Sequence, residues 1–338
     1  MAFPTGWNSK HKLTIDNTKV SGSSNLTNFP VYLSGDNFLS DVFTKAAARR
    51  EINANWLLND ANLQGYWRLE SDGSDESSNG YDLTNSGASF VTGKFGNGVD
   101  LELTESDYLY IVDASCPNLE ISGSQTWSAW VKAESSVPPG RYAIISKRDT
   151  SNTGHWLRIG DTQLFQFGLT GLNTNVNSSV TMSTATWYHL VGIYNSSTNK
   201  LSIWVNGVKS GETSVTGSVA DSNANFAIGC EFSGAGDTAA QFFDGIIDDV
   251  AIFNRALSDY EVKALYYGTA DLRFSSDFSG STELASEVVF FDPDNSLAEV
   301  HVKVPTVSYN TDTDFYVWYE ASTEAPYAPS ATYGSQAV

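Results

Sequence analysis

Short runs of alternating apolar and polar residues recur along the whole chain, and they restrict its fold more than any other feature. Clusters of Asn, Gly, Ser and Asp separate the runs. Clear examples are SAWVKA (128–133), YHLVGIY (188–194), KLSIWVNG (200–207) and DFYVWYEA (314–321). Successive side chains of a β-strand point to opposite faces, so a period of two predicts a strand with one buried face. The sequence therefore predicts an all-β fold built from antiparallel sheets.

Three local signals predict where individual elements begin and end. Asn206-Gly207 lies between two alternating runs and supplies the positive-φ pair of a two-residue hairpin turn. Ser258 and Glu261 have the spacing of a capping box, which predicts a helix that stops at Gly268. An Ala-rich segment with apolar residues on one face predicts a linking helix at about 46–58.

The chain is long enough for two domains, and its strand signals suggest an insertion. With 338 residues, roughly two domains are expected. Residues 1–45 and 269–338 are both strand-like, and each is too short to bury a core alone. We expect them to form one discontinuous β-sandwich that carries residues 46–268 as a separate domain in a loop.

Composition excludes several partners. Asp and Glu number 39 against 19 Lys and Arg, a formal net charge of −20, which disfavours nucleic acid and anionic membranes. No apolar run is long enough to cross a bilayer, and the start of the chain lacks an apolar signal segment. Cys116 and Cys230 are expected to be buried thiols, although the sequence leaves their pairing open.

Motifs of the common enzyme classes are missing from the sequence. It has no Glu-x-Asp-x-x-Glu strand of the kind found in related glucanases, and no pair of carboxylates stands out as acid and base. It also lacks a Gly-x-Ser-x-Gly elbow, a phosphate-binding loop and any His or Cys spacing typical of zinc. We therefore expect that the protein is not an enzyme.

One apolar strand contains two adjacent aspartates. In GIIDDVAI, a period of two places Ile246, Asp248, Val250 and Ile252 on one face. A carboxylate that points inward with Val250 is expensive to bury without a partner, so a cation or a proton should compensate for it.

The middle of the chain resembles a laminin-G-like jelly roll of the concanavalin A-like superfamily. The motifs that carry the resemblance are GYWRLESDGSDESSNGYDLTNSG (65–87), GKFGNGVDLE (93–102), TWSAWVKA (126–133), TWYHLVGIYN (186–195), LSIWVNGV (201–208) and FDGIIDDVAIFNRALSDYEVKALY (243–266). The resemblance implies a two-sheet antiparallel sandwich that is most often a binding module, and many members hold calcium.

The flanks resemble a second family, a bacterial and phage domain of unknown function that often neighbours such jelly rolls. Its first part is similar to residues 6–33, and its later part is similar to residues 269–321. Since this family has no assigned activity, it implies an architecture and no chemistry.

The first resemblance also implies a calcium site. Asp75 and Asn79 fit the family's short acidic turn beside the last strand, and Ca²⁺ prefers carboxylate, amide and backbone oxygens. We expect Asp75, Asn79 and Asp248 to hold one structural Ca²⁺, with the Gly80 backbone as a weaker addition. In the alternative, Asp75 and Asn79 only cap a turn through bonds to the backbone.

A sugar-binding surface would need exposed aromatic rings. Candidates close to loops are Tyr142, His155, Trp156 and Phe165, whereas five other tryptophans lie on motifs of the family core and are assigned to packing: Trp67, Trp127, Trp130, Trp187 and Trp204.

These features together favour a non-enzymatic, calcium-stabilised surface adhesion or carbohydrate-binding protein. It would act outside the cell or on a virion surface, as a phage decoration or receptor-binding protein does, with a glycan or a cell-surface or virion protein as partner. Self-association into a homo-oligomer is a further expectation. A structural virion or surface scaffold without sugar binding is the alternative, and a glycan-degrading enzyme is a more distant one.

Overall fold

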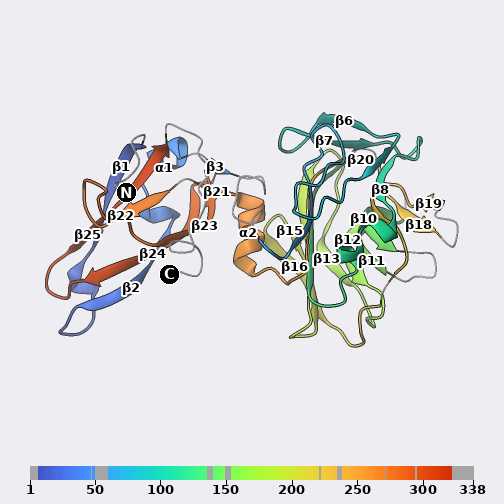
Figure 1. Ribbon diagram of the computed structural model, residues 1–338. Coiled ribbons are helices and arrows are strands. Elements are labelled where there is room, and N and C mark those ends of the chain that lie inside the picture. Colours follow the sequence, from blue (N-terminus) through green and yellow to red (C-terminus); the bar gives the residue numbers. More distant parts are fainter. Residues whose placement is uncertain are drawn as a thin grey trace. The chain divides into compact units, whose positions relative to one another are not determined.

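The computed structural model describes residues 7–46, 48–49, 60–134, 140–148, 154–220, 222–233, 238–270, 272–293 and 295–321 (Figure 1). The chain divides into two compact units, Leu57–Val262 and Met1–Trp56 with Lys263–Val338. Strands dominate both units and every pairing of neighbouring strands is antiparallel, so the all-β prediction is confirmed. Among the described residues, no helix has the length and apolar character needed to cross a membrane.

The larger unit is a sandwich of two antiparallel sheets. The seven-stranded sheet has the order β13 (Val176–Thr181), β12 (Leu164–Leu169), β11 (Gly154–Ile159), β10 (Tyr142–Arg148), β17 (Phe226–Ile228), β8 (Tyr108–Ile111) and β5 (Thr84–Ser86). The eight-stranded sheet has the order β16 (Val208–Ser214), β15 (Lys200–Val205), β14 (Trp187–Asn195), β9 (Gln125–Ala133), β20 (Gly245–Phe253), β7 (Asn97–Leu101) and β6 (Ser89–Thr92), and β4 (Leu63–Trp67) also pairs with β20. A separate hairpin joins β18 (Glu231–Ser233) to β19 (Thr238–Ala240).

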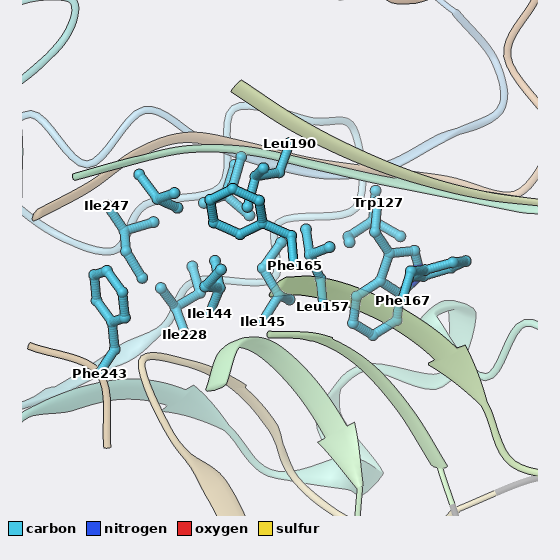
Figure 2. Packing of buried hydrophobic residues seen from close by; sticks show 14 of the residues in the cluster. Trp127, Ile144, Ile145, Leu157, Phe165, Phe167, Leu190, Ile228, Phe243 and Ile247 are labelled. Atoms are coloured by element: carbon cyan, nitrogen blue, oxygen red, sulfur yellow. The ribbon is translucent and has the colours of Figure 1, made fainter. Parts of the chain in front are cut away.

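The core of this unit fills the space between the two sheets. Figure 2 shows Trp127 of β9 near Phe167 of β12, and Phe165 in the same layer. The packing leaves no room at Gly192, where a Cβ atom would lie 2.3 Å from the Phe167 ring. Close packing of this kind makes added atoms costly, so the site requires glycine.

The residues assigned to packing are mostly buried. Trp67, Trp127, Trp130 and Trp204 are at most 4% exposed, whereas Trp187 is partly exposed. Cys116 and Cys230 are both free and buried. Burial raises the pKa of each thiol, which keeps both groups protonated and apolar.

The two strongest local predictions are confirmed. Asn206 and Gly207 have φ angles of 53° and 73° and join β15 to β16 in a two-residue turn. The helix α2 (Asp259–Tyr267) begins with the capping box, in which the Ser258 N–H donates to Glu261 Oε2 (2.6 Å) and the Glu261 N–H donates to Ser258 Oγ (3.3 Å). Gly268, with φ 86°, ends it.

We expect Ser258→Ala to lower the free energy of unfolding by about 1 kcal/mol, because an alanine cannot accept the Glu261 amide bond. Urea denaturation followed by far-ultraviolet circular dichroism measures the change. Exposed Ser23, changed to alanine, is the matched control. Equal effects of the two substitutions would contradict the capping assignment.

The smaller unit takes its strands from both ends of the chain. One sheet has the order β1 (Trp7–Ile15), β25 (Thr313–Ala321) and β22 (Arg273–Ser275), and the other has the order β2 (Leu26–Ser34), β24 (Leu297–Val307) and β23 (Ser286–Asp292). The helix α1 (Ser40–Lys45) adds Val42 and Phe43 to the core, where Phe43 stacks on Phe291 with ring centroids 5.0 Å apart. Both rings lie within this unit's apolar core, where an aromatic pair adds to the free energy gained by burial.

The linking helix predicted at about 46–58 falls largely outside the described residues. Within it, Ala48–Arg49 forms the short strand β3, which pairs with β21 (Thr269–Ala270), so the helix prediction is wrong at these two residues. Their partner lies more than two hundred positions away in the chain. Such a pairing overrides the local helix propensity of alanine and arginine.

Candidate functional site

The two adjacent aspartates lie where β20 changes its neighbour. β20 pairs with β7 over Gly245–Ile247 and with β4 over Val250–Phe253. Between these segments its register with β9 shifts, and Asp249 has a φ of 50°. This β-bulge interrupts the alternation of side chains.

The predicted inward face of β20 is therefore wrong at Ile246 and Asp248 and right at Val250 and Ile252. Ile247, Val250 and Ile252 join the core between the sheets, whereas Asp248 does not. A bulge adds one residue to the strand, and each extra residue moves the following side chains to the opposite face.

Backbone amides surround the Asp248 carboxylate. Asp248 is 1% exposed, and its Oδ2 accepts hydrogen bonds from the N–H groups of Lys94 (2.7 Å) and Phe95 (2.8 Å). Burial raises the pKa of Asp248 to about 8, although these two bonds oppose the shift. The adjacent Asp249 accepts a hydrogen bond from the Tyr66 hydroxyl of β4.

Asp75 caps a turn on the other side of β4. Its carboxylate accepts four hydrogen bonds, from the N–H groups of Tyr66 (2.9 Å), Ser77 (2.8 Å) and Tyr81 (2.8 Å) and from Ser77 Oγ (2.8 Å). The Tyr66 C=O also bonds to this segment, by accepting from the Glu76 N–H. The backbone N–H and C=O of Tyr66 thus point away from β20 and toward this turn. Asp75 therefore matches the alternative prediction, in which it caps a turn through bonds to the backbone.

The four residues predicted to bind calcium do not converge in the described structure. Asp75 and Asp248 lie on opposite edges of β4. Asn79 donates to the Gln64 C=O (3.0 Å) and accepts from Asn118 Nδ2 (2.9 Å), while Gly80 occupies a turn with φ 67°. The two carboxylates therefore bond to different segments, Asp75 to the turn at Ser77 and Tyr81 and Asp248 to the amides of Lys94 and Phe95. Calcium binding as such stays a prediction.

A different acidic group could hold a cation. The carboxylate oxygens of Asp100, Glu102 and Glu134 all lie within 4.8 Å of one another. Desolvation raises the pKa of Asp100 and of Glu102, and nearby Asp244 adds to both shifts. Mutual repulsion of this kind is what a bound cation would relieve.

Three of the four predicted sugar-stacking residues belong to the core of the sandwich. Phe165 is fully buried in the core (Figure 2), with its ring centroid 5.0 Å from that of Tyr188, and Tyr142 is 8% exposed within the same core. His155 is 1% exposed beside Trp127, where burial lowers its pKa to about 4. A sugar ring cannot stack on these side chains while the sandwich is closed, which corrects the expectation for all three.

Trp156 lies on the outer face of the seven-stranded sheet. Because side chains alternate along β11, Trp156 points away from the core into which His155 points, and it is partly exposed. A Cβ on Gly168 of β12 would lie 2.2 Å from the Trp156 ring. The indole therefore lies across the backbone of Gly168.

Two arginines and one glutamate hold this indole in place. The guanidinium carbons of Arg148 and Arg158 lie 4.7 Å and 4.8 Å from the Trp156 ring centroid. Glu231 accepts hydrogen bonds from Nη1 of Arg148 (2.8 Å) and from Nη1 of Arg158 (3.3 Å). Gln166 Oε1 accepts from Arg158 Nε (3.1 Å). We call these five residues the Trp156 cluster.

The three charged members of the cluster are each only 5% exposed. Buried ion pairs require satisfied geometry, and one carboxylate shared by two guanidinium groups fixes both around the indole. The residues predicted from the sequence did not include Arg148, Arg158 or Glu231. The one available signal was the position of Arg158, two residues after Trp156, which places both side chains on one face of a strand.

Comparison with known proteins places the larger unit in a known fold. The model of the concanavalin A-like lectin/glucanases superfamily matches residues 103–263. The binding domain of Paraclostridial Mosquitocidal Protein 1 aligns with a TM-score of 0.51 and 20% identity, over 66% of this chain and 56% of that chain. The similarity to this domain supports the assignment of a concanavalin A-like sandwich. The present chain spans about half of the length of that binding domain.

Two further solved structures are similar at lower scores. Domain 4 of AbnA, a GH43 extracellular arabinanase from Geobacillus stearothermophilus in complex with arabinotriose, has a TM-score of 0.45 and 20% identity, over 61% of this chain and 98% of that chain. Trypanosoma rangeli sialidase in complex with sialic acid has a TM-score of 0.47 and 18% identity, over 67% and 36%. No curated protein matches the sequence.

Proposed function

We propose that the protein is a non-enzymatic carbohydrate-binding protein that acts outside the cell, and that its glycan binds at the Trp156 cluster. The observation that carries the proposal is the partly exposed indole of Trp156, which lies across Gly168 and has the guanidinium carbons of buried Arg148 and Arg158 4.7 Å and 4.8 Å from its ring centroid. The concanavalin A-like sandwich supports it, since the outer face of a rigid sheet is a suitable platform for a ligand.

A fixed aromatic ring lowers the cost of binding. Sugar rings stack on aromatic side chains through their C–H faces, and an indole offers the largest surface for this contact. The backbone of Gly168 and the two arginines already restrict the Trp156 ring, so little side-chain freedom remains to be lost on binding.

We expect Trp156→Ala to weaken glycan binding by about tenfold or more, because a central aromatic anchor contributes more than about 1.4 kcal/mol to binding. A glycan array identifies ligands of the wild type, and isothermal titration compares the variants. Trp187→Ala is the matched control, since Trp187 is also partly exposed beside a cation, Lys132, but lies on the eight-stranded sheet.

Gly168→Ala provides an independent test that keeps the indole. Its new Cβ would displace the Trp156 ring, so it should weaken binding in the same direction as Trp156→Ala. Unchanged affinity in both variants, or equal losses in Trp187→Ala, would overturn the proposed site. If the wild type binds no glycan on the array, the proposed function itself is overturned.

A glycan-degrading role is the second candidate, and the acidic group favours it. Retaining glycosidases place two carboxyl groups about 5 Å apart, with the pKa of the acid raised. The carboxylate oxygens of Asp100 and Glu102 lie within 4.8 Å of one another, and burial raises the pKa of both. If the wild type releases reducing sugar from a glycan and Glu102→Gln abolishes this release, the degrading role is supported. If the wild type releases no reducing sugar under the same conditions, the binding role is supported.

A further inference from the structure

A second aromatic surface lies on the smaller unit, apart from the Trp156 cluster. Phe278, in the loop between β22 and β23, is 65% exposed, the largest exposed fraction of any large apolar side chain among the described residues. Its ring packs edge-to-face with that of Tyr316 of β25, with centroids 5.7 Å apart. We propose that these two residues, the Phe278 platform, form a second binding site, which takes a neutral sugar ring of a glycan.

Hydrogen bonds fix the loop that carries Phe278. The Ser275 hydroxyl of β22 donates to the Asp277 C=O (2.8 Å), which ties the loop to the sheet. The Asp277 carboxylate accepts five hydrogen bonds, from the N–H and hydroxyl groups of Ser279 and Ser281 and from the N–H of Thr282. A side chain on such a loop has little freedom left to lose when a ligand binds.

Lys10 of β1 fixes the Phe278 ring itself. Its Nζ lies 3.3 Å from the centroid of this ring and donates to the Phe278 C=O (2.8 Å). The same Nζ lies 4.6 Å from the ring centroid of Trp318, the cross-strand partner of Lys10 on β25. Since the ammonium group covers one face of the Phe278 ring, the opposite face is the one that can stack on a ligand.

Polar groups suited to sugar hydroxyls lie beside Tyr316. Lys12 of β1 is its cross-strand partner, and Lys12 Nζ lies 3.1 Å from Asp314 Oδ2. The side chains of Lys12 and Asp314 are 53% and 41% exposed, and an exposed pair of this kind contributes little to stability. The pair offers a donor and an acceptor whose charges compensate each other, which matches the hydroxyl groups of a neutral sugar.

The size of the Phe278 platform favours a sugar over a protein partner. Phe278 is 65% exposed and Tyr316 only partly exposed, so the two rings present on the order of 200 Å². A standard protein–protein interface covers about 800 Å² of each partner. One or two sugar rings need no more than this platform provides. The formal net charge of −20 also disfavours an anionic membrane as the occupant.

The test uses the full chain with Trp156→Ala, which removes the first proposed site. A glycan array, and isothermal titration with cellotetraose, maltotetraose and N-acetylchitotetraose, measure the binding that remains. We expect this variant to retain binding to at least one glycan, and we expect the further substitution Phe278→Ala to weaken it about tenfold or more. Phe278→Tyr keeps an aromatic ring and should retain the binding.

Further variants test the surroundings of the platform. Phe29→Ala is the matched control, since Phe29 is a 40% exposed phenylalanine on β2, in the other sheet of the same unit. Lys10→Gln should weaken binding several-fold, because the Phe278 ring is then no longer fixed, whereas Lys10→Arg should preserve most of it, because a guanidinium group also packs on an aromatic face. Thermal melting establishes that each variant is folded.

The outcomes separate this inference from the proposed function. If Trp156→Ala abolishes all glycan binding, or if Phe29→Ala costs as much affinity as Phe278→Ala, the inference is overturned and the proposed function stands. If Trp156→Ala binds like the wild type and Phe278→Ala abolishes binding, the Trp156 site fails and the inference stands. A wild type that binds no glycan overturns both. Sedimentation velocity detects contacts between copies, and a dimer that Phe278→Ala dissociates would also overturn the inference.

Discussion

Replacing Asp75 with alanine is expected to lower the free energy of unfolding by about 3–5 kcal/mol. One carboxylate accepts four hydrogen bonds and thereby ties the turn at Ser77 and Tyr81 to the backbone of β4 at Tyr66. Alanine leaves three backbone N–H groups without their acceptor, and hydrogen bonds to charged groups are the strongest of their kind. Urea denaturation followed by tryptophan fluorescence measures the loss.

Asp72→Ala is the matched control for this prediction. Asp72 is an exposed aspartate of the same turn region and accepts from the Ser74 N–H (3.0 Å), so its removal should cost less than about 1 kcal/mol. We expect the loss in Asp75→Ala to be the same with calcium and with a chelator. A loss seen only with calcium would instead support the predicted calcium role of Asp75.

Asp248→Asn is expected to abolish a pH dependence of stability that the wild type shows. The pKa of Asp248 is about 8 in the folded protein, against an ordinary value of 3.8 for the unfolded chain. Between pH 4 and pH 8 the folded state therefore holds a proton that the unfolded state has lost. Stability then falls as pH rises from 4 toward 8, by at least about 2 kcal/mol, because ionisation in the folded state is unfavourable there. Asparagine is neutral, and its Oδ1 can still accept the amides of Lys94 and Phe95.

Urea denaturation at intervals from pH 5 to pH 9 measures this slope. Asp36→Asn is the control, because Asp36 is exposed and its substitution should leave the slope unchanged. A wild-type slope in the Asp248→Asn variant would contradict the assignment. If saturating calcium flattens the wild-type slope, a cation replaces the proton as the partner of Asp248, and the calcium prediction is favoured.

Elements that depend on neighbours in sequence could be predicted, and elements that depend on distant strands could not. The turn at Asn206-Gly207 and the cap at Ser258 rest on bonds within a few residues. The bulge at Asp248 arises because β4 and β7 meet β20 from distant parts of the chain. A strict period of two contains no information about that junction.

The candidate site was predictable only in part, for the same reason. Trp156 could be named because it lies in a strand-like run near a loop, but the same reasoning also named its neighbour His155, which points into the core. Nothing local connects Glu231 to Arg148, since 83 positions separate them and only the pairing of the sheets brings them together. Buried ion pairs of this kind are a property of the tertiary structure.

Fluorine NMR of the fluorotryptophan-labelled protein tests the central claim, glycan binding at Trp156, most directly. The chain has nine tryptophans, and the spectra of Trp156→Phe and Trp187→Phe assign the two signals of interest. Addition of a bound glycan should shift the Trp156 signal and leave the Trp187 signal in place. A shift of the Trp187 signal while the Trp156 signal stays unmoved would contradict the account.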